Sequence, residues 1–180
     1  MELKLIKRKP PIGADECWVL DHYAAPGGRT ELTELFTDAK YRHPAGGAQL
    51  GNRLAETVRV CAPNTSWLKR ADKVVAIPSS RSLARQFAAA LALELGLDRP
   101  ANDDLAWARP VPSMKSFLAA ERAAQLDRAM TAAPISGGSV VLVDDLMESL
   151  ATFAEASRAV RLAGADRVTC IALVLIDRDL

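Results

Sequence analysis

The chain has 180 residues, of which 49% are hydrophobic and 25% are charged, which is typical of one globular domain with a single core and excludes a wholly disordered chain. The formal net charge of +1 gives no reason to expect bulk attraction to nucleic acid or to an anionic membrane. No apolar run approaches the ~20 residues of a membrane span, and the polar start MELKLIKRKPP is unlike a secretory signal, so we expect a cytoplasmic location.

Strands and helices are predicted to alternate along the chain. Residues 1–14 are rich in lysine, arginine and proline, and we expect a flexible lead-in before a single domain over residues 15–180. In chain order the predicted elements are a strand at 17–23, a helix at 30–41, a helix from about 48, a strand at 74–77, a helix at 83–95, a short strand at 105–108, a helix at 113–130, a strand at 140–143, a helix at 152–162 and a strand at 168–176. This order predicts an α/β fold with a mainly parallel sheet flanked by helices on both faces.

The segment from Val140 to Thr152, VVLVDDLMESLAT, carries the strongest functional signal. Four branched aliphatic residues after Gly137 and Gly138 are typical of a buried parallel strand, and Asp144 and Asp145 follow at its expected carboxyl end. In open α/β sheets, ligands bind at this edge. Two adjacent carboxylates after a buried strand are costly without a partner, which favours a ligand or metal role over capping of the next helix.

The motif VVLVDD resembles that of type I phosphoribosyltransferases, which have an apolar strand, two acidic residues and a loop rich in threonine and glycine; the ComF-like subgroup is the most similar. The resemblance runs in order over roughly residues 18–176. It extends to ELTELFTDAKYRH, DKVVAIPSSRSLARQF and ARPVPSMKSFLAAERAAQL. In these three segments the matched positions are Lys40, Tyr41, Arg85, Phe87, Arg109, Lys115, Glu121 and Arg122.

The resemblance implies a Rossmann-like phosphoribosyltransferase fold, binding of phosphoribosyl pyrophosphate with Mg²⁺, and transfer of the phosphoribosyl group to a nitrogen acceptor with release of pyrophosphate. Asp144 and Asp145 are then the expected catalytic residues and metal ligands, because oxygen atoms suit both Mg²⁺ and ribose hydroxyls. Backbone N–H groups and hydroxyls at the start of a helix suit the 5′-phosphate. The expected substrate-binding residues are Glu148, Ser149, Leu150, Ala151 and Thr152 on the phosphate side, and Ser79, Ser80, Arg81, Arg85, Arg109 and Lys115 on the pyrophosphate side.

The loop after the two acids departs from the family pattern x-x-Thr-Thr-Gly-x-Thr. Glu148 places a carboxylate where the phosphate is expected, and Leu150 replaces a glycine that is free to adopt positive φ. Two like charges ~4 Å apart repel by ~4 kcal/mol at an effective dielectric constant of 20. The cysteine-rich zinc module of many ComF-like proteins is also missing, since Cys17, Cys61 and Cys170 are far apart and form no CxxC pair.

Several alternatives stay open at this point. Arg81, Arg85, Arg109 and Lys115 are equally well explained as surface cations. Glu121 and Arg122 lie within a helical pattern, and a role in structural ion pairs is favoured for them over a binding role. A receiver domain would have further strands after its acid pair, and a dinucleotide-binding enzyme would have a glycine-rich turn that PSSRSLARQ lacks. We therefore consider two hypotheses. In the first, the protein is an enzyme that acts on a ribose phosphate; in the alternative, it is an inactive nucleotide sensor or partner-binding module.

The remaining expectations concern partners and pathway. The expected partner is a small-molecule ribose phosphate or nucleotide, with a homodimer left open and neither membrane nor nucleic acid indicated. A link to DNA uptake or processing follows from the ComF resemblance alone. The acceptor base is not indicated by any motif.

Overall fold

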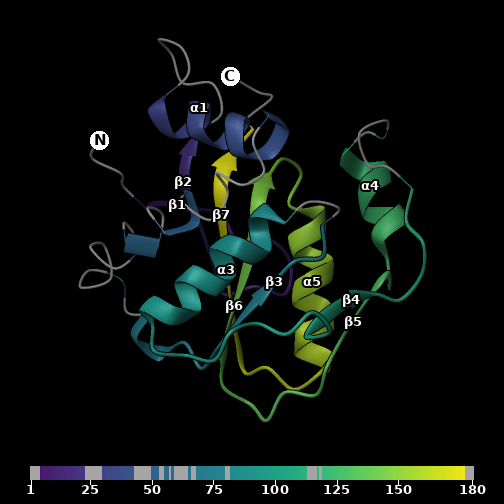
Figure 1. The fold of residues 1–180 in the computed structure, drawn as a ribbon. Helices are drawn as coiled ribbons and strands as arrows, with labels where there is room; N and C mark the ends of the chain where they lie inside the picture. The colour runs from purple at the N-terminus through teal and green to yellow at the C-terminus, as the bar shows by residue number, and fades with distance from the viewer. Residues whose placement is uncertain are drawn as a thin grey trace.

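The computed structural model describes residues 5–22, 30–42, 50–52, 55–56, 58, 65, 68–79, 82–112, 117 and 119–176, without the side chains of residues 68, 119 and 120. These residues form an α/β structure in which helices flank a mostly parallel sheet, as predicted (Figure 1). None of the helices in this part of the chain combines the length and apolar character needed to span a bilayer.

The main sheet has five strands in the order β1-β2-β7-β6-β3. Their bounds are Ile6–Arg8 for β1, Glu16–His22 for β2, Lys73–Ala76 for β3, Ser139–Met147 for β6 and Arg167–Leu175 for β7. All neighbours are parallel except β1, which pairs with β2 in the antiparallel direction. The carboxyl ends of the four parallel strands therefore share one edge of the sheet.

The expectation of a flexible lead-in over residues 1–14 does not hold for β1. Ile6 pairs with Val19, and Arg8 pairs with Cys17, so this short strand covers the outer edge of β2. Ile6 also packs against the core on one face of the sheet. A basic three-residue strand has little sequence signal, because its pairing is provided by β2, whose partner residues lie 9 to 13 positions further along the chain.

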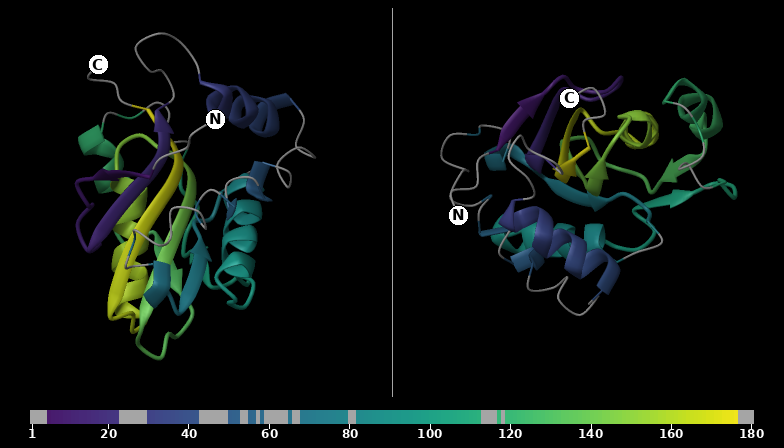
Figure 2. Two further views of the ribbon diagram at one scale, coloured as in Figure 1. Left: turned by 90° about the vertical axis from the view of Figure 1, so that its left-hand side faces the viewer. Right: turned by 90° about the horizontal axis from the view of Figure 1, so that it is seen from above.

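Helices cover both faces of the sheet (Figure 2). One face carries α1 (Glu31–Thr37) with its π-helical continuation η1 (Asp38–Arg42), helical residues 50–52, 55–56 and 58, and α3 (Leu83–Glu94); η3 (Leu68–Arg70) precedes β3. The other face carries α5 (Ala151–Leu162). Two further elements contact α5: the hairpin of β4 (Leu105–Trp107) and β5 (Met130–Ala132), and the helix α4 (Ala119–Leu126).

The strand β6 contributes side chains to the hydrophobic cores on both faces of the sheet, because successive side chains of a strand point to opposite faces. Val141 and Val143 pack in the core beneath α1 and α3, whereas Val140 and Leu142 pack beneath α5. This double burial explains why the strand is a continuous aliphatic run rather than an alternating one.

The predicted helix over residues 113–130 is shorter than expected. Within the described residues, α4 ends at Leu126, and Met130 begins β5 instead of closing the helix. Ala129 donates its N–H to Leu126 and accepts from Ala108, and Arg128 has a positive φ of 52°. The chain leaves the helix here because pairing with β4 satisfies the backbone of residues 130–132.

Candidate functional site

The acid pair lies inside β6 rather than after it, which corrects the expected strand end. β3 stops at Ala76, the register partner of Val143, and Ile77 donates one further hydrogen bond to the carbonyl of Val143. Beyond this point the described partner of β6 is β7, with Asp144 level with Ala172. The two carboxylates therefore lie on the part of β6 that extends past β3, at the carboxyl edge of the sheet.

Asp145 is held by a lysine from a distant segment. Lys40 Nζ lies 2.8 Å from Asp145 Oδ1, and the two side chains are only 12% and 4% exposed. Lys40 comes from η1, and Figure 1 shows α1 above the carboxyl ends of β2 and β7. No donor among the described residues reaches the other oxygen, Asp145 Oδ2, which is buried. A buried carboxylate oxygen without a donor is costly unless a ligand hydroxyl, water or cation completes it.

Asp144 points in a different direction from Asp145, and its pKa is raised. Successive strand residues point to opposite faces, so Asp144 points away from the α1 face on which Lys40 meets Asp145. Burial, followed by the charge of Asp145, raises the pKa of Asp144 to about 8. The backbone N–H of Asp145 donates to Asp144 Oδ1 at 2.7 Å. Near neutral pH the pair therefore provides one protonated and one lysine-paired carboxyl group.

Glu148 is neutralised by Arg122, in a structural ion pair of the kind that the sequence interpretation favoured for this arginine. Arg122 Nη1 lies 2.8 Å from Glu148 Oε2, and Nη2 donates to Oε1 at 3.3 Å. Arg122 Nε also donates to the carbonyl of Phe117, and the arginine side chain is 6% exposed. The sequence placed Arg122 in a matched motif but had no signal for its partner, which is 26 residues away.

Leu150 keeps the backbone shape of the glycine expected at its position. Its φ of 54° and ψ of −11° are left-handed, and it is the N-cap of α5 without a side-chain capping bond. A left-handed leucine costs roughly 1–2 kcal/mol relative to the ordinary helical region. Its side chain packs at the edge of the core beneath α5, and this contact compensates for part of that cost. Leu150 therefore has a left-handed backbone conformation that glycine adopts more readily.

The other predicted site residues are dispersed. Ser149 and Thr152 are partly buried at the start of α5, next to buried Ala151. Ser79 and Arg85 are exposed after β3 and in the first turn of α3. Ser80, Arg81 and Lys115 lie outside the described residues.

Arg109 has a structural role at the end of α4. Its guanidinium donates to the carbonyl oxygens of Gln125 at 2.7 Å and Asp127 at 3.2 Å. These carbonyls belong to the last turn of α4 and the loop after it, where a cation is electrostatically favourable. In this structure the guanidinium of Arg109 therefore contacts the end of α4, and its role in binding pyrophosphate stays a prediction.

A magnesium ion fits the chemistry of the acid pair. Across the described part of the chain, no three His, Cys, Asp or Glu side chains are grouped as metal ligands. Mg²⁺ commonly binds through one or two carboxylates and keeps several waters, so Asp145 Oδ2 is a suitable ligand atom with Asp144 beside it.

The comparisons with known proteins add no identification. No family model matches the sequence, and no curated protein matches it. The resemblance to phosphoribosyltransferases stays a prediction.

Proposed function

We propose that this protein binds a ribose phosphate at the carboxyl edge of β6, with phosphoribosyl pyrophosphate and Mg²⁺ as its ligand and cofactor. We also propose that the chain has the type I phosphoribosyltransferase fold and is most similar to the ComF-like subgroup. The observation that carries it is Asp145 Oδ2, a buried acceptor without a donor among the described residues, beside a second carboxyl group at the edge where α/β proteins bind ligands. Ribose hydroxyls and a hydrated magnesium ion both match that acceptor.

Each residue then has a defined task. Asp145 accepts from a ribose hydroxyl or binds the cation, and its contact with Lys40 fixes its rotamer. Asp144, protonated near neutral pH, donates to a second ribose oxygen. Asp145, with Asp144 beside it, would hold Mg²⁺, and the ion would supply charge neutralisation for pyrophosphate. In the transfer, the nitrogen of the acceptor forms a bond to carbon 1 while the bond from carbon 1 to the pyrophosphate oxygen breaks, and pyrophosphate leaves with that electron pair. Stabilisation of the separating charges is the main catalytic effect that such a site provides.

A second function, a catalytically inactive nucleotide sensor or partner-binding module, is favoured by the Arg122–Glu148 pair. Glu148 lies at the start of α5, where the 5′-phosphate is expected, and its carboxylate already occupies the nearby arginine. Among the described residues, a phosphate there meets a carboxylate and an arginine that is already paired. The two functions differ in whether phosphoribosyl pyrophosphate binds and turns over.

Calorimetric titration with phosphoribosyl pyrophosphate and Mg²⁺ separates them. The first function predicts saturable heat, at least about tenfold weaker binding in Asp145→Asn, and pyrophosphate release with a nitrogenous base. The variant Asp145→Asn also removes the carboxylate that Lys40 contacts, which can lower stability by itself. The double variant Asp145→Asn Lys40→Met removes both charges and tests the loss of binding without that effect. Asp98→Asn, at an exposed position, is the matched control. Binding without turnover supports the sensor, and no heat at millimolar ligand contradicts the ribose phosphate site.

A further inference from the structure

A polar cavity of about 410 Å³ lies between the end of α3 and the start of β3. Asp72 and Lys73 line it at the start of β3, residues 96–101 line it along the turn after α3, and Asp104 lines it just before β4. This volume falls in the range of roughly 300–1,000 Å³ that is typical of small-molecule sites.

The cavity lies at the edge of the sheet opposite to the acid pair. Lys73 begins β3 and is level with Val140, whereas Asp144 lies four residues further along β6. At roughly 3.3 Å per residue, the two levels are about 13 Å apart along the strand. A ligand site here is therefore separate from the ribose phosphate site proposed above and does not depend on it.

Charged side chains fix the walls of the cavity. Lys73 Nζ lies 2.6 Å from Asp104 Oδ1, and Asp104 Oδ2 accepts from the N–H of Ala101 at 2.7 Å. The Asp104 side chain is only 9% exposed. On the β3 side, Asp72 Oδ2 accepts from the N–H of Ser139 at 2.7 Å. Such preformed walls reduce the ordering cost of binding.

Three charged groups of the lining are left for a ligand. Asp98 and Arg99 are exposed, and within the described part of the chain neither side chain has an ion-pair or hydrogen-bond partner. Asp72 is also exposed, and its hydrogen bond uses one of its two carboxylate oxygens. Since Lys73 and Asp104 neutralise each other, the lining offers a ligand two carboxylates and one guanidinium.

The end of α3 adds to the negative potential of the cavity. Its last turn has no basic residue and ends with Glu94, so no side chain of the helix compensates the partial negative charge at its C-terminus. Gly96 turns the chain there with a φ of 69°, and the Leu97 N–H donates to the Ala92 carbonyl at 2.8 Å. Cations are therefore favoured beside this helix end, whereas Arg99 favours a carboxylate.

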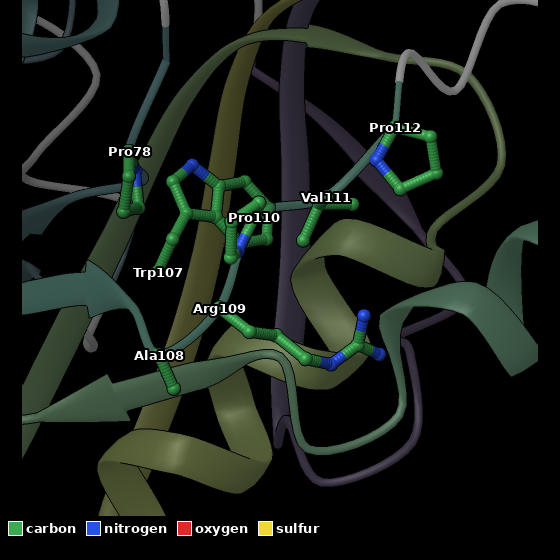
Figure 3. A pocket seen from close by; sticks show the side chains of 7 residues that line it. All are labelled: Pro78, Trp107, Ala108, Arg109, Pro110, Val111 and Pro112. Carbon is green, nitrogen blue, oxygen red and sulfur yellow. The ribbon is translucent and has the colours of Figure 1, made fainter.

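The groove beside Trp107 differs from this cavity in its lining (Figure 3). It has a volume of about 480 Å³ and is bounded by three prolines, a valine, an alanine, the indole and Arg109. Figure 3 shows the Arg109 side chain running away from the indole, and its guanidinium binds carbonyl oxygens at the end of α4. A small molecule with several charges therefore finds complementary partners in the cavity at α3 and not in this groove.

We propose that the cavity at the end of α3 binds a free basic amino acid, of which lysine is the simplest case. The two ammonium groups of lysine match Asp72 and Asp98, and its carboxylate matches Arg99. The unpaired lining groups carry two negative charges and one positive charge, and lysine carries the reverse. An aliphatic diamine leaves Arg99 without a partner, and an acidic amino acid meets two carboxylates.

Calorimetric titration with L-lysine at low ionic strength tests the proposal. An exposed ion pair changes affinity by up to about fivefold, so we expect saturable binding in the millimolar range that is roughly fivefold weaker in Asp98→Asn Arg99→Gln. The control Lys69→Gln Asp103→Asn removes the same charges at exposed positions outside the lining and should bind lysine normally. Because all four side chains are exposed, both variants should fold, and their Tm values check this.

Two analogues separate the contributions of the charged groups. Cadaverine lacks the carboxylate and norleucine lacks the second ammonium group, so each should bind more weakly than lysine. Equal binding of either analogue overturns the assignment to a basic amino acid. No saturable heat with lysine, or binding that the double variant leaves unchanged, overturns the site.

Two further measurements do not depend on a change in lysine affinity. Amide NMR signals of residues 96–101 should move when lysine is added to the unmodified protein, and unmoved signals there overturn the site. Binding of phosphoribosyl pyrophosphate should be the same in the double variant Asp98→Asn Arg99→Gln and in the unmodified protein. A loss confined to the variant overturns the separation of the two sites.

Discussion

Arg122 and Glu148 form a two-contact ion pair between α4 and the turn before α5, with atoms 2.8 Å and 3.3 Å apart. The guanidinium is almost completely buried, whereas the carboxylate is 21% exposed. A buried arginine requires an anion, and here the chain provides its own. The glutamate of the loop therefore provides the counter-charge of this buried arginine.

Replacing Glu148 should therefore expose an anion site. We expect Glu148→Thr to lose about 1–3 kcal/mol of unfolding free energy, because Arg122 loses its counter-charge. Inorganic phosphate should restore part of this loss and raise Tm more than equal ionic strength of chloride does. Thermal unfolding with both salts measures the effect. Arg122→Met Glu148→Met is the control that should not respond to phosphate; an equal response in both variants contradicts the account.

Substitutions of Leu150 should separate the energetic cost of its left-handed backbone from the stabilisation by its side-chain packing. In Leu150→Gly the left-handed strain is removed, but packing and chain entropy are lost, so we expect a net change within about 1 kcal/mol. Leu150→Ala keeps the strain and loses the packing, and should cost about 1–2 kcal/mol. Urea unfolding should therefore rank glycine above alanine. The reverse order would mean that φ near 54° is not costly here. With Glu148→Thr added, Leu150→Gly should also increase affinity for a 5′-phosphate.

Ionisation of Asp144 should lower the free energy of unfolding as the pH rises. Its pKa is 3.8 when unperturbed and about 8 in the folded protein, so between these values the folded state holds a proton that the unfolded state has released. The stabilisation is complete below pH 3.8 and is lost as the pH rises to about 8. Asp144→Asn should remove this slope, with a relative gain on the order of 1 kcal/mol or more at pH 9 compared with pH 4. Chemical denaturation across that range, with Asp98→Asn beside it, gives the comparison.

Glu155 should contribute stability in the opposite pH range. Burial alone raises its pKa, but hydrogen bonds from Arg158 and from the Met130 N–H outweigh burial and lower it below 4.5. Its contribution is therefore present above pH 4.5 and is lost as the pH falls through the folded pKa. Glu155→Gln should cost about 3 kcal/mol at pH 7 and flatten the acid limb of the stability curve. Hydrogen exchange at Met130 should accelerate, because the hairpin loses its link to α5. Unchanged exchange would contradict that link.

Much of the fold was predictable because its signals are local. The aliphatic run at residues 140–143, the threonine cap at Thr30 and the stop at Gly96 each express the preference of a short segment. Thr30 Oγ1 accepts from Thr33 N at 3.1 Å, as a capping residue should. β1 and β5 were missed because each is three residues long and depends on a partner strand that sequence periodicity does not reveal.

The sequence by itself determined that two carboxylates follow a buried aliphatic run, that a glutamate and a leucine occupy the loop after them, and that a lysine ends an early helix. Only the tertiary structure decided their states: Lys40 neutralises Asp145, Arg122 neutralises Glu148, and Leu150 is left-handed. It also decided that Trp107 lines a groove. The physical reason is that charge pairing and burial depend on distances between residues up to 105 positions apart, which packing creates and no local pattern encodes.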